Sequence, residues 1–265
     1  KVIILLLLLD IMLIVAFLLP GLTPKNFHFF MPRRITKILA VIIVSYGIGY
    51  SSLIFQTVTN NHILTPSVMG LDSLYLFIQT FIIFVAGSQT LSQMIGYKHF
   101  LICVGLMIFA ACILFLLLFR GSSKNVYFLI LTGMIMGSLF NGMATFMQVL
   151  LDPNEFAVLQ GRMFASFNNI NSNLVGISIL IIILVCIISV KDLPYLDVLL
   201  LGPENAISLG VDYKKLILKT LIICAVLVSV STALVGPITF LGILIVNLAR
   251  HMLGTYSHRS LSRSE

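Results

Sequence analysis

The sequence predicts an all-α fold, a polytopic bundle of transmembrane helices. Of its 265 residues, 59% are hydrophobic and only 9% are charged, whereas roughly 25% of the residues in an ordinary soluble domain are charged. Long apolar stretches recur from one end of the chain to the other. A soluble fold leaves about a quarter of its unfolded surface in water and needs polar side chains there. The composition therefore indicates lipid as the solvent.

Eight stretches are predicted to be membrane spans, because a helix crosses the hydrocarbon core with about 20 apolar residues, or about 17 when it is upright. Barrel strands are excluded, since the stretches lack a two-residue alternation. No small-residue cleavage pattern follows the first stretch, so it is predicted to be a helix and not a secretory signal. The last stretch is the weakest, being short and containing Asn247 and Arg250. The eight stretches are 2–19, 35–55, 68–87, 100–119, 126–151, 174–190, 216–235 and 238–253.

The loop charges predict a cytoplasmic N-terminus. Lys and Arg accumulate in cytoplasmic loops, and this orientation places ten of the 16 basic residues inside and six outside. The pair Arg33 and Arg34 falls outside and opposes it. The long connection 152–173 is then external and the connection 191–215 cytoplasmic. No repeat of fixed period appears, so residues 1–265 are predicted to form a single transmembrane domain.

Two predicted spans carry polar residues on one face, at spacings of three and four. Amides facing lipid would be costly if unsatisfied, so each face must look at other helices or at water. Two interpretations remain open: interhelical hydrogen bonding, and a neutral polar lining for the passage of a bulky hydrophilic solute. The stripes are Ser45, Gly49, Ser52 and Gln56 in the second span, and Ser138, Asn141, Thr145 and Gln148 in the fifth.

Other features bound the function further. Gly133 and Gly137 form a GxxxG pair, which predicts close packing of the fifth span. Asp10 lies midway along the first span, where a lone carboxylate is weak evidence for an ion or proton route. No phosphate loop, zinc motif or hydrolase motif occurs, so no catalysis, metal or cofactor is expected. The basic residues form no continuous basic face, which argues against nucleic acid as a partner.

Short motifs along the chain resemble the FecCD-type permease family, which imports iron-siderophore complexes, haem and cobalamin. In that family a proline-arginine pair precedes the second helix, and a glutamine, an asparagine-proline loop and a glycine follow it. The last span is similar to the family's GxIxFxGLxxPHxxRxxxG, although Val246 and Asn247 stand where proline and histidine are usual. The matching residues are Arg33, Arg34, Gln56, Asn60 or Asn61, Pro66 and Gly70, and then Gly236, Ile238, Phe240, Gly242, Arg250 and Gly254.

The segment 201–210 resembles the family's LGxExAxxLG element, which forms the coupling helices that sit on the ATPase. The matches are Gly202, Glu204, Ala206, Leu209 and Gly210. The resemblance therefore implies a cytoplasmic coupling segment at about 196–213. Pro203 suits a first helical turn and Gly210 suits a C-terminal cap, so one short surface helix is expected there.

The resemblance also implies the remaining parts of an ABC importer in a bacterial cell membrane. These are ABC ATPase subunits, a second permease subunit, an extracellular or periplasmic substrate-binding protein, and a ferric siderophore as cargo. Ten helices are usual in the family, so about eight of an expected ten are present and two more are expected after Arg259. The residues expected to line the translocation pathway are Ser52, Gln56, Asn60, Asn141, Thr145 and Gln148.

Three alternatives remain open at this level. A secondary transporter or channel would use Asp10 and Asp72 for ion coupling without an ATPase. A truncated permease would be an inactive membrane scaffold. Haem or cobalamin could replace the ferric siderophore as cargo.

Overall fold

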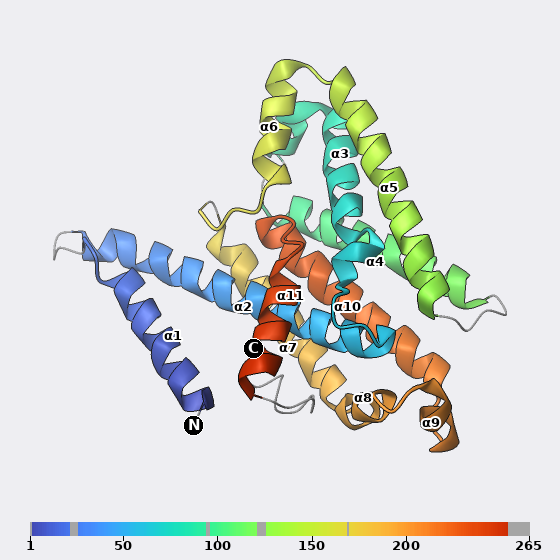
Figure 1. Ribbon diagram of the computed structural model, residues 1–265. Coiled ribbons are helices and arrows are strands. Elements are labelled where there is room, and N and C mark those ends of the chain that lie inside the picture. Colours follow the sequence, from blue (N-terminus) through green and yellow to red (C-terminus); the bar gives the residue numbers. More distant parts are fainter. Residues whose placement is uncertain (1, 22–25, 94–95, 121–125, 169, 254–265) are drawn as a thin grey trace.

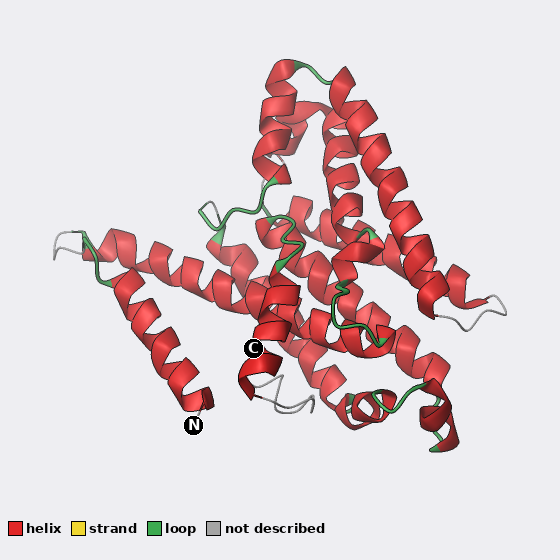
Figure 2. Ribbon diagram, viewed as in Figure 1, coloured by secondary structure: helices red, strands yellow, loops and turns green. Residues whose placement is uncertain are grey.

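The computed structural model describes residues 2–21, 26–93, 96–120, 126–168 and 170–253. In these ranges the chain forms helices joined by turns, and Figure 2 shows no strand among them. The elements are α1 (Val2–Leu18), α2 (Phe27–Thr59), the 3-10 turn η1 (Pro66–Met69), α3 (Leu71–Gln93), α4 (Tyr97–Arg120), α5 (Val126–Leu150), α6 (Pro153–Met163), α7 (Ser172–Val190), α8 (Leu193–Leu199), α9 (Pro203–Ser208), α10 (Tyr213–Val235) and α11 (Leu241–Leu253).

The predicted all-α class is confirmed, and each of the eight predicted spans coincides with a helix. By length and composition, α2, α4, α5, α7 and α10 can each cross a membrane, whereas the apolar parts of α1, α3 and α11 are shorter. Large apolar side chains stand on the outside of the bundle; Phe146 is 68% exposed and Val149 80%. Side chains of this kind fit a surface that lipid covers.

The central helix is α10, which packs against α2, α4 and α7 and crosses the middle of the body in Figure 1. Small side chains let its neighbours approach closely. A Cβ added to Gly47 of α2 would lie 2.8 Å from Ser231 Oγ, and Cys224 Sγ donates a hydrogen bond to the Ser51 carbonyl at 3.3 Å. The buried core of the subunit therefore forms around α10.

At one end of the body α3, α5 and α6 lie together (Figure 1). The start of α3 crosses the middle of α5 at two glycines. A Cβ on Gly133 would lie 3.0 Å from Met69 Cα, and a Cβ on Gly137 would lie 2.7 Å from Gly70 Cα. The close packing predicted for the GxxxG pair is confirmed. This close contact also places the first residue of α3 beside the middle of α5.

The two arginines of the N-terminal motif act on α1 and on the first turns of α2. Arg34 Nη1 donates to the Leu18 carbonyl at 2.6 Å, where the last carbonyls of α1 lack helical partners. The Arg33 guanidinium lies 4.1 Å from the centre of the Phe29 ring, a cation-π contact. Arg34 thus fixes how α1 meets α2, whereas Arg33 acts within the first turns of α2.

The connection 191–215 contains two short helices, α8 and α9, so the expectation of a single helix is corrected. Pro203 begins α9 as predicted. Gly210 ends it at φ +82, and its N–H bonds to the Ile207 carbonyl at 2.9 Å while the Val211 N–H bonds to the Ala206 carbonyl at 3.1 Å. This pair of bonds is the Schellman motif. The external connection also contains a helix, α6, that the sequence patterns did not predict.

Candidate functional site

Two residues of the polar stripe on α5, Ser138 and Asn141, line a small hollow beside the start of α3. Ser138, Asn141 and Thr145 are exposed on this face, and Gln148 is half-buried. The hollow measures about 230 Å³ and none of its lining side chains is charged. It is lined by Ser67, Val68, Gly70, Ser73, Met134, Gly137, Ser138 and Asn141.

The hydrogen bonds of the stripe explain how it can remain polar on the outside of a helix. Ser138 Oγ donates to the Met134 carbonyl at 3.0 Å, and Thr145 Oγ1 donates to the Asn141 carbonyl at 2.9 Å. Each hydroxyl hydrogen is thereby used inside α5, and the oxygen lone pairs remain available as acceptors. The surface therefore presents neutral groups that can bind a polar solute weakly.

The similar stripe on α2 has a different environment. Ser52 is 1% exposed and Gln56 is fully buried, because α11 covers this face of α2. Arg250 Nη1 donates to Gln56 Oε1 at 2.5 Å, and Ser52 lies against Gly242, where no Cβ could fit. These residues therefore connect two helices of one subunit. Interhelical contact accounts for both side chains here, and their place in a pathway lining stays a prediction.

Arg250 also donates to His62 Nδ1 at 2.8 Å, in the loop after α2. Partial burial, and then the charge of Arg250, lower the pKa of His62 below its ordinary value of 6.5. A lowered pKa favours the neutral imidazole, which is the form that can accept from the guanidinium. Arg250 consequently links α11 to both the end of α2 and the following loop.

Asn60, another predicted pathway residue, ends α2. Its backbone has φ +47, and its N–H bonds to the Thr57 carbonyl while the Asn61 N–H bonds to the Gln56 carbonyl. Asparagine tolerates this left-handed conformation better than most residues. Asn60 is exposed, but the hollow on α5 is lined by other residues.

Comparison with known proteins decides the family. The FecCD transport family matches residues 2–264. The chain belongs to this family. It is 50% identical over 236 residues to the petrobactin import system permease protein YclO of Bacillus subtilis, covering 89% of this chain and 75% of YclO. It is 40% identical over 227 residues to the petrobactin import system permease protein FatC of Bacillus anthracis, covering 86% of this chain but only 64% of FatC.

A solved structure gives the same fold. It shows a metal-chelate type ABC transporter in an inward-facing conformation, and it superposes with a TM-score of 0.85 over the whole of this chain and 84% of that one. Sequence identity is 23%, so this comparison supports the fold alone. The predicted family is confirmed, and with it a transport subunit in place of an enzyme.

The glycines of the FecCD motifs occupy positions that the backbone requires. Gly236 follows α10 at φ +103, and a Cβ there would lie 3.0 Å from the Phe164 carbonyl oxygen. Gly70 ends η1, which Pro66 begins, at φ +83. Phe240 is 73% exposed, and Gly254 lies outside the described residues. The motif therefore serves mainly to bring backbone segments close together.

The segment that resembles the LGxExAxxLG element lies on α9 and its caps. Ala206 is fully buried, whereas Glu204, Leu209 and Gly210 are exposed. Gly202 precedes α9 at φ +94. One face of this short helix is thus anchored in the subunit, and the other is free for a partner.

Sequence reasoning missed the contribution of the segment around the start of α3. Ser67 and Ser73 line the hollow on α5, but their spacing of six matched no helical stripe. Asp72 Oδ2 accepts a hydrogen bond from Thr239 Oγ1 at 2.9 Å, which links α3 to the segment before α11. Asp10 lies on an exposed face of α1. The two acidic residues of the ion-coupled alternative therefore lie in separate environments.

Proposed function

We propose that this chain is the permease subunit of an ABC importer that carries ferric siderophore complexes into the cytoplasm, and that petrobactin is the siderophore. The 50% identity to YclO, a petrobactin permease by name, is the observation that carries the substrate class. ATP hydrolysis belongs to separate ABC ATPase chains. A second permease subunit, identical or different, and an external substrate-binding protein complete the importer.

The polar face of α5 is the part of this subunit best suited to line the pathway. A ferric siderophore is large and polar, and it must leave the pathway as readily as it enters. Such passage requires many weak, exchangeable contacts in place of a tight cage. Asn141 and Thr145, together with the serines of the neighbouring hollow, supply neutral hydrogen-bonding groups of that kind. Gln148 adds a further neutral group, although its amide also donates to Thr80 Oγ1 of α3 at 3.3 Å. A second permease subunit facing α5 would close the other side.

The coupling segment 196–213 is the proposed contact with the ATPase. Closure of the ATPase subunits would press on the exposed residues Glu204, Leu209 and Gly210. Since α9 is capped at its C-terminal end and anchored by Ala206, it would move as a rigid element. The result would be a rigid-body shift of the adjoining spans.

The test is uptake of radiolabelled ferric petrobactin by vesicles that contain this chain with its ATPase, second permease and binding protein. ATP-dependent uptake is expected, and Asn141→Leu should reduce it several-fold. Met143→Leu introduces the same side chain two residues further along α5 and should transport normally.

Two results would contradict the proposal. ATP-dependent transport of haem or cobalamin, with none of ferric petrobactin, would contradict the substrate. Ion-driven transport without any copurifying ATPase would contradict the importer class and favour a secondary transporter or channel.

A further inference from the structure

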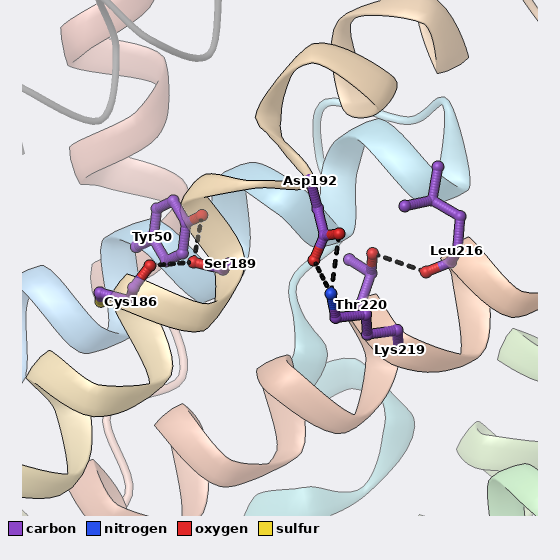
Figure 3. A network of polar contacts seen from close by, with 7 residues as sticks. All are labelled: Tyr50, Cys186, Ser189, Asp192, Leu216, Lys219 and Thr220. Carbon is purple, nitrogen blue, oxygen red and sulfur yellow. Dashed lines mark hydrogen bonds and ion pairs between the residues drawn. The ribbon is translucent and has the colours of Figure 1, made fainter. Parts of the chain in front are cut away.

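A polar network joins α2, α7 and α10 where the coupling segment begins (Figure 3). Lys219 Nζ of α10 donates to Asp192 Oδ1 at 2.8 Å and lies 2.7 Å from Asp192 Oδ2. Three residues earlier, the Ser189 and Tyr50 hydroxyls are 2.8 Å apart. Ser189 Oγ also donates to the Cys186 carbonyl at 2.9 Å. Because a hydroxyl has one hydrogen, Tyr50 is the donor to Ser189.

The carboxylate of Asp192 does not cap the helix that follows it. Asp192 is the residue before α8, where an aspartate normally caps the helix with its carboxylate, yet it makes no such bond. Its carboxylate turns to Lys219 on another helix (Figure 3). Asp212, in the same position before α10, does cap its helix by accepting from the Lys215 N–H. The cross-helix contact of Asp192 thus replaces a local one.

The ion pair closes a ring at the base of the subunit. The chain leaves α7 at Asp192, passes through α8 and α9, and returns in α10, so that 27 positions separate Asp192 from Lys219. Inside the ring Leu196, Leu199 and Ala206 are buried in the same apolar cluster as residues of α10. These apolar contacts fix the depth of α8 and α9, and the ion pair fixes the end of α7 against α10.

Stability alone is a weak reason for this contact. The Lys219 side chain is 44% exposed and the Asp192 side chain 12%. An ion pair whose lysine is half in water contributes little to the free energy of folding. Its main physical effect is therefore on the relative position of α7 and α10.

We propose that the Asp192–Lys219 ion pair is a positioning contact that makes α7 and α10 move together with the coupling segment when the ATPase subunits close. The inference rests on the proposed importer function and adds to it a specific mechanical link. Without the pair, α9 could shift while the ends of α7 and α10 separate. ATP hydrolysis would then continue with less transport.

The test measures ATP hydrolysis and uptake of radiolabelled ferric petrobactin in the same vesicles, which contain the complete importer. Lys219→Met should lower the number of siderophores imported per ATP by about fivefold, the size of effect that a single contact has on coupling between sites. The complex should still assemble and hydrolyse ATP. Exchanging the charges in the double variant Asp192→Lys, Lys219→Asp should restore the ratio.

Lys215→Met is the matched control. Lys215 lies one turn earlier on the same helix and pairs with Asp212, but this pair is local in sequence and its side chains are 86% and 55% exposed. The control should import at the ratio of the unmodified importer.

Several outcomes would overturn the proposal. One is an unchanged number of siderophores imported per ATP in Lys219→Met, and another is an equal fall of that number in Lys215→Met. A third is a charge-exchanged variant that does not recover the number. The fourth is failure of Lys219→Met to assemble, which would make the pair a folding determinant. Absence of uptake by the unmodified importer is a different result. It would refute the proposed function, and the inference with it.

Discussion

Replacing Gly137 with alanine is expected to push the start of α3 away from α5. A Cβ at position 137 would lie 2.7 Å from Gly70 Cα and 3.4 Å from Gly70 N, whereas non-bonded carbon atoms rest about 3.5–4.0 Å apart. Both of these atoms belong to the backbone, so no side chain can rotate out of the way. The start of α3 must therefore retreat by about 1 Å to relieve the contact.

The expected cost follows from the usual effect of overpacking, about 1–3 kcal/mol. For a chain of this size, each kcal/mol lowers the melting temperature by about 2–4 °C. Thermal unfolding of the purified protein in detergent should therefore show a melting temperature about 2–12 °C lower than that of a glycine-to-alanine variant of α5 that makes no such contact. Uptake should fall as well, because Gly70 and Gly137 both line the hollow on α5.

Gly142→Ala is the control on the same helix. A Cβ there would meet nothing within 4 Å, and alanine favours a helix over glycine by about 1 kcal/mol. The melting temperature of this variant should stay the same or rise. If Gly137→Ala melted as high as Gly142→Ala, the argument from close backbone packing would be wrong.

Three further predictions concern other contacts. Arg250→Met should lower the free energy of unfolding by about 1–3 kcal/mol, because Gln56 Oε1 is left buried without its donor. A lower melting temperature of this variant would confirm the prediction, and an unchanged melting temperature would contradict it. Because the pKa of His62 is lowered on folding, the unfolded chain binds more protons between the two pKa values. The melting temperature should thus be highest above pH 6.5 and fall as the pH drops below it, and His62→Gln should flatten this dependence. Gly210→Trp should abolish uptake without preventing membrane insertion. A side chain at φ +82 strains the cap of α9 by about 1–2 kcal/mol, and the tryptophan covers the proposed ATPase contact. Normal uptake by this variant would refute that contact.

The spans could be predicted because lipid imposes a strong and local constraint. A helix that crosses the hydrocarbon core must be apolar along its whole length, and this signal is complete within each stretch of sequence. The short helices α6 and α8 are missed for the opposite reason. Each is amphipathic or only a few residues long, and contacts with the rest of the subunit hold it in place. The three short helices all have a proline in the first turn, but α9, which begins at Pro203, also has Gly210 to mark its end.

The two polar stripes show where sequence reasoning on the site stops. Spacing places Ser52 with Gln56 on one face, and Asn141 with Thr145 on another, but it cannot say what each face meets. The partner of Gln56 is Arg250, 194 positions further along the chain. The stripe on α5 remains open on its outer side. Two stripes with similar spacing thus meet different surroundings, because packing with residues far along the chain decides what each face contacts.

Two of the three shorter spans, α3 and α11, point to how the two ends of the subunit are connected. Irregular backbone precedes both α3 and α11, and such backbone is tolerated at membrane depth only where protein buries it or a cavity receives it. Here the irregular segment before α11 meets the first turn of α3, since Thr239 Oγ1 donates to Asp72 Oδ2. The Asp72 end of this contact adjoins Ser73, which lines the hollow on α5.

One helix connects that contact with the coupling segment. The first turns of α10 hold Lys219 in its ion pair with Asp192, and its last residue leads through Gly236 to Thr239. A helix of 23 residues is about 35 Å long and transmits displacement along its axis. Since α10 is packed on several sides by other helices (Figure 1), movement imposed at α9 must either carry the whole helix or break the Asp192–Lys219 pair. In the proposed importer, α10 would be the element through which closure at the ATPase reaches the polar face of α5.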